Sequence, residues 1–263
     1  NFHGSVFFES YDYIIHSDSL IIETMSTNEE NEEISYCNAK GNVLVKNNEF
    51  KLTGSKLDYF PLDNEIKVEG SIDYISSLAR FSSEIIVINN NEIHASSGLR
   101  PMSVILPNTK ELGFEIYESD DSAYNNNELI VICSNLDIKK SDQEYYCNFY
   151  NNVKIDYGMI NLKANSMDMI WENDVSNSKA FNLNNLSAKG NIEMSQGDYF
   201  AKANSLNIDP GLNIVTLIGE AYFEDQNGAV YGDIIDYDRT SKKTRVRNES
   251  PNSRTKIKFN FLD

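Results

Sequence analysis

The sequence is poor in cysteine, proline and basic residues, and it contains no long apolar run. Three cysteines, Cys37, Cys133 and Cys147, are too few and too scattered for a zinc site or a disulfide scaffold, although one bridge, for example Cys133 to Cys147, can form. The absence of an 18-residue apolar stretch predicts that no helix spans a membrane. A formal charge of -17 argues against binding to nucleic-acid phosphates or anionic membrane surfaces.

Motifs of catalysis and metal binding are also missing. His3, His16 and His94 lie outside any Cys or Ser motif, and the chain has no Gly-x-Ser-x-Gly, HExxH, CxxC or phosphate-binding glycine loop. The acidic clusters at 118–121 and 236–243 lack the glycine and ligand spacing of a calcium loop, and the acidic run at 28–35 is typical of a solvated loop. We therefore expect no enzyme activity, no cofactor and no metal.

The residues that are abundant favour β-structure. The 13 Phe and 15 Tyr residues, with many Ile and Val, are typical of strands, and a convincing helical period is absent. Strands with one apolar and one polar face are indicated by "NEIKVEG" at 64–70 and "SLNIDP" at 205–210, where apolar residues alternate with polar ones. This pattern predicts antiparallel sheet that covers a single core.

An internal repeat relates the two halves of the chain. Displacing the sequence by 149 positions aligns residues 39–88 with 188–237 without a gap, and ten of these fifty positions are identical, where about three are expected by chance. The matches include Gly41-Asn42 with Gly190-Asn191, Pro61 with Pro210, and Asn64 with Asn213. We interpret these as turn residues that end strands.

A smaller unit recurs inside each copy. A Gly-x-apolar start occurs at 4–6, 41–43 and 70–72, and its counterparts lie at 151–153, 190–192 and 219–221. Repeats of this length predict stacked strand-turn-strand layers with a continuous core. The Pro-, Gly- and Asn-rich stretch between 96 and 128 reads as a linker, so we predict modules at 1–122 and 123–263.

The segment 186–248 resembles the OstA/LptA family of periplasmic lipopolysaccharide-transport proteins. The resemblance rests on Ala188-x-Gly190-Asn191-Ile192, Gln196-Gly197-Asp198, Ala203-Asn204-Ser205-Leu206, Leu217-x-Gly219 and Gly232-Asp233-Ile234-x-Asp236-Tyr237. The first half matches more loosely, and residues 92–108 are similar to the related LptC-type bridge component. The chain thus looks like two tandem modules. The first module is similar either to the OstA/LptA family or to the LptC-type component.

The resemblance implies an all-β fold of two tandem open β-jellyrolls, each folded like a taco, that form one continuous antiparallel stack. It implies a periplasmic location with any signal segment removed, and the acyl chains of lipid A as ligand. Jellyroll domains of other bridge components, or further copies of the chain, are the implied partners. The lipid-lining residues expected are Val43, Val45, Leu57, Tyr59, Ile66, Val68, Ile72, Ile192, Met194, Leu206, Ile208, Val215, Leu217, Phe223 and Ile234. The docking-edge residues expected are Val6, Phe8, Ile257, Phe259 and Phe261.

Two other functions stay open at the level of sequence. The chain fits a structural or adhesive β-solenoid that binds protein or glycan and carries no lipid. A β-helical carbohydrate-active enzyme would require a pair of carboxylates in a cleft, which spacing alone does not reveal in a strand-rich chain.

Overall fold

The structure, a computed structural model, describes residues 1–10, 13–28, 31–106, 128–157, 160–173, 181–248 and 255–259. Strands make up nearly all of these residues, and every strand pair is antiparallel. The predicted all-β class is confirmed. None of the described segments forms a helix that could cross a membrane.

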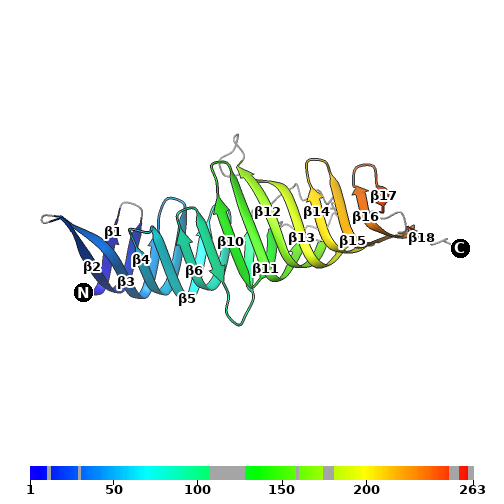
Figure 1. Ribbon diagram of the computed structural model, residues 1–263. Coiled ribbons are helices and arrows are strands. Elements are labelled where there is room, and N and C mark those ends of the chain that lie inside the picture. Colours follow the sequence, from blue (N-terminus) through cyan, green and yellow to red (C-terminus); the bar gives the residue numbers. More distant parts are fainter. Residues whose placement is uncertain are drawn as a thin grey trace. The chain divides into compact units, whose positions relative to one another are not determined.

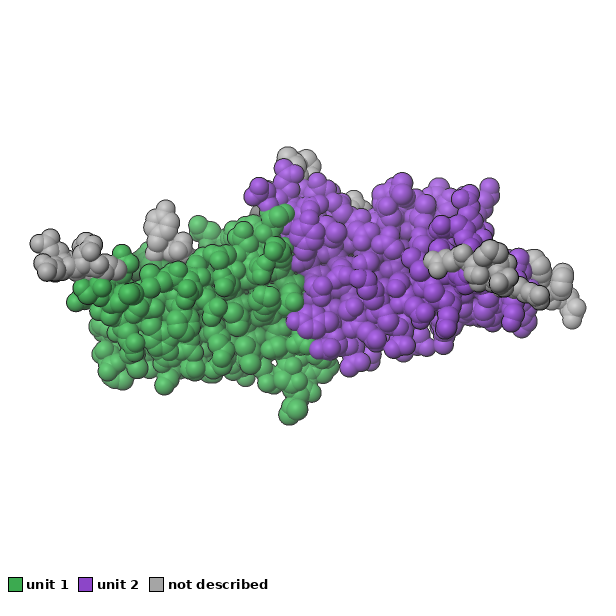
Figure 2. Space-filling view, viewed as in Figure 1, with its two compact units in different colours: residues 1–105, 134–141 green, residues 106–133, 142–263 purple. Residues whose placement is uncertain are grey.

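The chain forms two compact units (Figure 2). Unit 1 contains residues 1–105 and 134–141, and unit 2 contains residues 106–133 and 142–263. The module boundary predicted at 122/123 lies outside the described residues, which resume at Glu128.

Unit 1 is a series of strands that pair mostly with their neighbours in the chain (Figure 1). In addition, β10 pairs with β7, and β8 pairs with β6. The strands are β1 (Phe2–Glu9), β2 (Ile14–Asn28), β3 (Asn31–Lys46), β4 (Phe50–Phe60), β5 (Glu65–Ser76), β6 (Arg80–Asn89), β7 (Glu92–Ser96), β8 (Met102–Leu106) and β10 (Asn135–Lys140).

Unit 2 repeats this arrangement. Here β9 pairs with β11, and both β17 and β18 pair with β16. The strands are β9 (Leu129–Cys133), β11 (Glu144–Tyr157), β12 (Ile160–Asn173), β13 (Phe181–Gln196), β14 (Tyr199–Asp209), β15 (Ile214–Asp225), β16 (Gly228–Asp238), β17 (Lys243–Arg247) and β18 (Lys256–Phe259).

A one-residue bulge interrupts every second long strand. In β3, Gly41 and Asn42 together face the single residue Ser55 of β4, since Lys40 pairs with Lys56 and Val43 with Gly54. Both bulge residues have positive φ, 74° and 45°, a conformation that glycine and asparagine tolerate best. The same bulge occurs at 4–5, 70–71, 151–152, 190–191 and 219–220. These are the six positions of the repeated Gly-x-apolar unit.

The interpretation of Gly41-Asn42 and Gly190-Asn191 as strand-ending turns is therefore wrong. Both pairs lie inside long strands, because a bulge bends a strand without reversing the chain. The prediction that Pro61 and Pro210 are turn residues is confirmed. Residues 61–64 form the turn between β4 and β5, and residues 210–213 form the turn between β14 and β15. The backbone N–H groups of Asn64 and Asn213 donate to the carbonyls of Pro61 and Pro210.

The bulges divide each unit into two wings. A wing is the set of paired strand segments that lies on one side of the bulges. In unit 1 the first wing contains the parts of β2 to β6 at 19–28, 31–40, 56–60, 65–69 and 85–89, with β7 and β10. The second contains 14–16, 43–46, 50–53, 72–76 and 80–83, with β8 and the end of β1.

In unit 2 the first wing contains 144–150, 166–173, 181–189, 205–209, 214–218 and 234–238, with β17. The second contains 153–157, 160–163, 192–196, 199–202, 221–225 and 228–232, with β9 and β18. In both units one face of each wing is apolar and buried, and these faces form the core.

One further expectation needs correction. The acidic run at 28–35 was expected to be a loop, but residues 31–35 belong to β3, where pairing with β2 extends the hairpin while the side chains of Glu32 and Glu33 stay exposed. The disulfide state, which the sequence left open, is also decided: Cys133 and Cys147 are not bridged, and all three cysteine thiols are free and buried. Burial raises the pKa of Cys37 to about 11 and that of Cys147 to about 12.

Candidate functional site

The candidate site of unit 1 is the apolar interior between its two wings. All seven residues expected to line it have inward side chains, with exposed fractions of 0 to 3%. They are Val43, Val45 and Ile72 from the second wing and Leu57, Tyr59, Ile66 and Val68 from the first wing. The structure therefore gathers all of them on one continuous surface.

The interior of unit 2 contains seven of its eight expected residues. Ile192, Met194, Leu206, Ile208, Val215, Leu217 and Phe223 are buried, with exposed fractions of 1 to 6%. Ile234 differs: it pairs with the exposed Ile218, whereas Ile235 pairs with Leu217 and is fully buried. The inward position on β16 thus belongs to Ile235, because side chains alternate between the two faces of a strand.

Several large inward side chains were missed by the sequence reasoning. They are Leu20, Leu52 and Ile86 in unit 1 and Phe149, Met167 and Met169 in unit 2, each no more than 2% exposed. Trp171, a residue type that is more often core or rim than a ligand platform, is also inward and fully buried. Alternation on β12 carried a usable signal, because Met167, Met169 and Trp171 occupy every second position.

Aromatic side chains join the two wings of unit 1. Tyr13, next to the second wing, contacts Tyr59 of the first wing edge to face, with ring centroids 5.6 Å apart. A row of rings continues along the second wing through Phe50, Tyr74 and Phe81, at centroid distances of 6.2, 5.7 and 4.8 Å. Since Tyr13 touches both wings, this row closes the side of the interior opposite the bulges.

Unit 2 has a smaller aromatic cluster in the equivalent place. Tyr237 of the first wing stacks on Phe223 of the second wing at 4.9 Å and lies 5.9 Å from Tyr199. Phe223 and Tyr199 are themselves 6.0 Å apart. We call these two groups, Tyr13/Tyr59 and Tyr199/Phe223/Tyr237, the aromatic closures of the units.

The interior is chemically simple. Ser17, Asn38, Asp58 and Ser83 are the buried polar or charged residues of the described chain, and of these Asn38 and Asp58 occupy the outer face of the first wing, opposite the inward Leu57. No group of three or more His, Cys, Asp or Glu side chains in the described segments could hold a metal ion. The arrangement suits an apolar ligand.

A charged network lies on that outer face of unit 1. Asp58 accepts hydrogen bonds from Tyr36 and from Asn38 (2.7 Å), and it pairs with Lys56 at 2.7 Å. Burial by itself raises the pKa of the Asp58 carboxyl, but the hydrogen bonds from Lys56, Tyr36 and Asn38 together outweigh it and lower the pKa. In unit 2 the corresponding residues are neutral: Asn185 donates to Asn207 at 3.0 Å.

Residues 134–243 match the family described as LptA/(LptD N-terminal domain) LPS transport protein. We call this segment, which is less than half of the chain, the LptA-like module because of its similarity to that family. It runs from β10, which unit 1 contains, through β11 to β16 of unit 2 to the start of β17.

Comparison with solved structures finds LptH, the LptA homologous periplasmic component of the lipopolysaccharide transport device of Pseudomonas aeruginosa. The alignment covers 49% of this chain and 92% of that one, with 15% sequence identity and a TM-score of 0.36. A search of curated proteins found no match.

The LptA-like module is followed by β18, where the inward row of the second wing becomes exposed. This row runs from Phe223, 5% exposed, through Val230, half-buried, to Ile257, 56% exposed. A cavity of about 110 Å³ lies here, lined in part by Phe223, Val230, Thr244 and Ile257. Phe259 belongs to β18, and Phe261 lies outside the described residues.

The other expected docking edge lies on β1. Val6 and Phe8 pair with Ser17 and Ile15 of β2, are half-buried and extend the inward row. Phe2 pairs with the buried Leu20 and is 54% exposed. Within the described residues β1 pairs with β2 alone, so its other edge has unused backbone hydrogen-bonding groups.

Proposed function

We propose that this chain is a periplasmic lipopolysaccharide-binding protein that shields acyl chains between the wings of its units during transport to the outer membrane. The observation that carries the proposal is an LptA-like module whose interior is a continuous apolar surface. Burial of acyl chain supplies about 0.8 kcal/mol per methylene, which is ample for a ligand with several long chains. The role needs no catalytic group.

Acyl chains must open the interior to enter it. The expected lining residues that point inward are already packed, with exposed fractions of 0 to 6%. The bulge side of each unit is continuous strand, whereas the opposite side is held by ring contacts between wings. Chains therefore enter by separation of the aromatic closures, while the sugar and phosphate head stays in water.

The ends of the chain serve as docking edges in this proposal. An unpaired strand edge with exposed apolar residues is a template for β-augmentation by a neighbouring jellyroll or by a second copy. Ile257→Asp and Phe2→Asp would each remove one apolar contact without reaching the packed core. Light scattering should show smaller assemblies for both variants than for the parent chain.

Site-specific photo-crosslinking tests the lipid proposal. A photoreactive phenylalanine analogue replaces one inward residue, Leu52 or Leu206, or the adjacent outward residue, Lys51 or Ser205, and the purified chain is irradiated with lipopolysaccharide. Adducts are expected at the inward positions alone, because the two faces of a strand look in opposite directions. Equal yields at inward and outward positions, or no adduct at either, would contradict the proposal.

A folding control accompanies each variant. The denaturant midpoint shows whether the substituted chain keeps a cooperative transition, and an inward variant that has lost it is replaced by the next inward residue, Leu57 or Leu217. A lipid-free core oligosaccharide used in place of lipopolysaccharide should give no inward adducts.

A further inference from the structure

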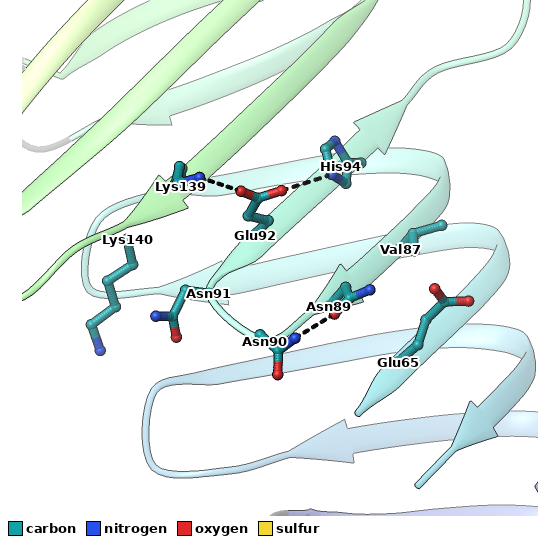
Figure 3. A pocket seen from close by; sticks show the side chains of 9 residues that line it. All are labelled: Glu65, Val87, Asn89, Asn90, Asn91, Glu92, His94, Lys139 and Lys140. Atoms are coloured by element: carbon teal, nitrogen blue, oxygen red, sulfur yellow. Dashed lines mark hydrogen bonds and ion pairs between the residues drawn. The ribbon is translucent and has the colours of Figure 1, made fainter. Parts of the chain in front are cut away.

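Unit 1 has a polar groove on the outer face of its first wing. The groove has a volume of about 570 Å³ and lies beside the hairpin turn that joins β6 to β7 (Figure 3). Its floor includes Val87, and its walls include Asn89, Asn91, Glu92 and His94. Lys139 pairs with Glu92 at 2.6 Å, and Glu92 in turn lies 3.7 Å from His94.

Unit 2 has a groove of nearly the same volume, about 540 Å³, on the outer face of its own first wing. The lining combines carboxylates, hydroxyls and cations with a few apolar side chains. Thr216 donates to Asp236 at 3.1 Å, and Asp238 accepts from the Ser241 hydroxyl at 2.7 Å. Lys243 and Arg245 of β17 form one wall.

The two grooves occupy equivalent positions of the repeat. The displacement of 149 residues relates Val87 to Asp236 and Asn89 to Asp238. The strand that follows has the same pairing in both units. In unit 1 His94 of β7 pairs with Val87, and in unit 2 Arg245 of β17 pairs with Asp236. The groove is thus a feature that the fold produces twice, with different side chains on the same backbone frame.

Both grooves are separate from the interior. Val87 lies between Ile86 and Ile88, which point inward, and Thr216 lies between the inward Val215 and Leu217. A ligand in either groove therefore contacts the opposite face of the same strands and does not compete with an acyl chain.

Each groove keeps polar groups that the protein itself does not engage. In the described chain, the side chains of Glu65 and Asn91 in unit 1 and of Lys243 and Arg245 in unit 2 form no hydrogen bond or close ion pair, although Lys243 attracts the Asp238 carboxylate electrostatically. Acceptors, amides and cations side by side, with a small aliphatic floor, suit a ligand whose groups both donate and accept. A net charge of -17 disfavours an anion.

We propose that the two outer grooves are glycan-binding sites for a neutral or zwitterionic, hydroxyl-rich saccharide. Hydroxyl groups donate to Glu65 and the Asp236/Asp238 pair, and they accept from Asn91, Lys139, Lys243 and Arg245. This activity goes beyond the proposed lipid transport, since it would anchor the outside of the protein to a glycan while the interior holds acyl chain.

A glycan array probed with the labelled full-length chain, followed by NMR titration with the strongest binding saccharide, tests the proposal. Backbone amide shifts are expected around residues 87–94 and 236–245. The double variant Glu65→Gln/Asn91→Ala should weaken the unit 1 response at least tenfold and leave that of unit 2 intact. Lys243→Ala/Arg245→Ala should have the reverse effect.

Control variants lie on the outer face of the second wings. Lys51→Ala in unit 1 and Lys154→Ala in unit 2 remove exposed cations outside the grooves and should change neither response. The proposal is overturned if no saccharide on the array binds, if shifts map to inward residues, or if the groove variants bind as the parent does. Lipopolysaccharide crosslinking at Leu206 would remain unaffected by any of these results, so the two proposals fail independently.

Discussion

The two units share a backbone frame but differ in the side chains that fill it. Leu52 and Ile72 line the second wing of unit 1, and the residues 149 positions later are Ala201 and Ala221, yet all four are almost completely buried. In contrast, the bulge glycines recur with φ of 74° and 77° at Gly41 and Gly190. Equivalent positions of the two units thus keep the same bulge geometry. The size of the buried side chains at equivalent positions differs, and the core tolerates this difference.

The largest effect is expected where the two units are most alike. Leu57 and Leu206 are equivalent and no more than 1% exposed, so Leu57→Ala and Leu206→Ala should each lower the free energy of unfolding by about 2 to 5 kcal/mol through lost contacts and a new cavity. Urea titration of both variants measures this. A loss below about 1 kcal/mol in either would show that its interior is loosely packed.

An intermediate effect is expected where the linings differ. Ala221→Ile introduces the side chain that unit 1 carries at position 72, and overpacking should cost about 1 to 3 kcal/mol. Under the proposed function it should also reduce lipopolysaccharide adducts at Leu206, which shares the interior of unit 2. Ala229→Ser, a small change at another buried alanine of the second wing, is the control. Undiminished adducts in a folded Ala221→Ile chain would show that lipid does not use this part of the interior.

The bulges should respond equally in the two units. A Cβ at Gly41 would lie 2.4 Å from the Asp18 carboxylate, and one at Gly190 would lie 2.4 Å from the Asn165 amide. Together with positive φ, this predicts that Gly41→Ala and Gly190→Ala each cost about 1 to 2 kcal/mol. Gly4 has positive φ but no neighbour within 4 Å of its Cβ, so Gly4→Ala isolates the backbone contribution. Similar losses for all three variants would rule out the close contact as a cause.

The smallest effect concerns the stability of the fold at acid pH, and it is expected in unit 1 but not in unit 2. Because the pKa of Asp58 is lowered on folding, its contribution is present at neutral pH and is lost as the pH falls below about 4 and through the folded-state pKa. Lys56 is 38% exposed, so screening should keep this contribution below about 1 kcal/mol. Asp58→Asn should flatten the decline in stability between pH 5 and pH 2. Asn207→Ala, at the neutral equivalent in unit 2, should leave the slope unchanged.

Much of the fold was accessible from the sequence because its signals are local. Alternation placed Ile66, Val68, Leu206 and Ile208 on inward faces, and the pairing of Pro with Asn three residues later marked true turns. Ile234 is a position that alternation along the strand does not place correctly. Two adjacent isoleucines follow a bulge that faces Asp233, and only the pairing of Leu217 with Ile235 decides which of them is inward.

By itself, the sequence determined the all-β class, the repeat of 149 residues and most of the interior lining, since each depends on neighbouring residues or on a period of two. The tertiary structure decided that Gly41-Asn42 bends a strand and does not end it, because a positive-φ pair is compatible with either and only the opposing Ser55 makes it a bulge. It also decided that aromatic rings join the wings and that the outer grooves recur, because both bring together side chains that are far apart in the chain.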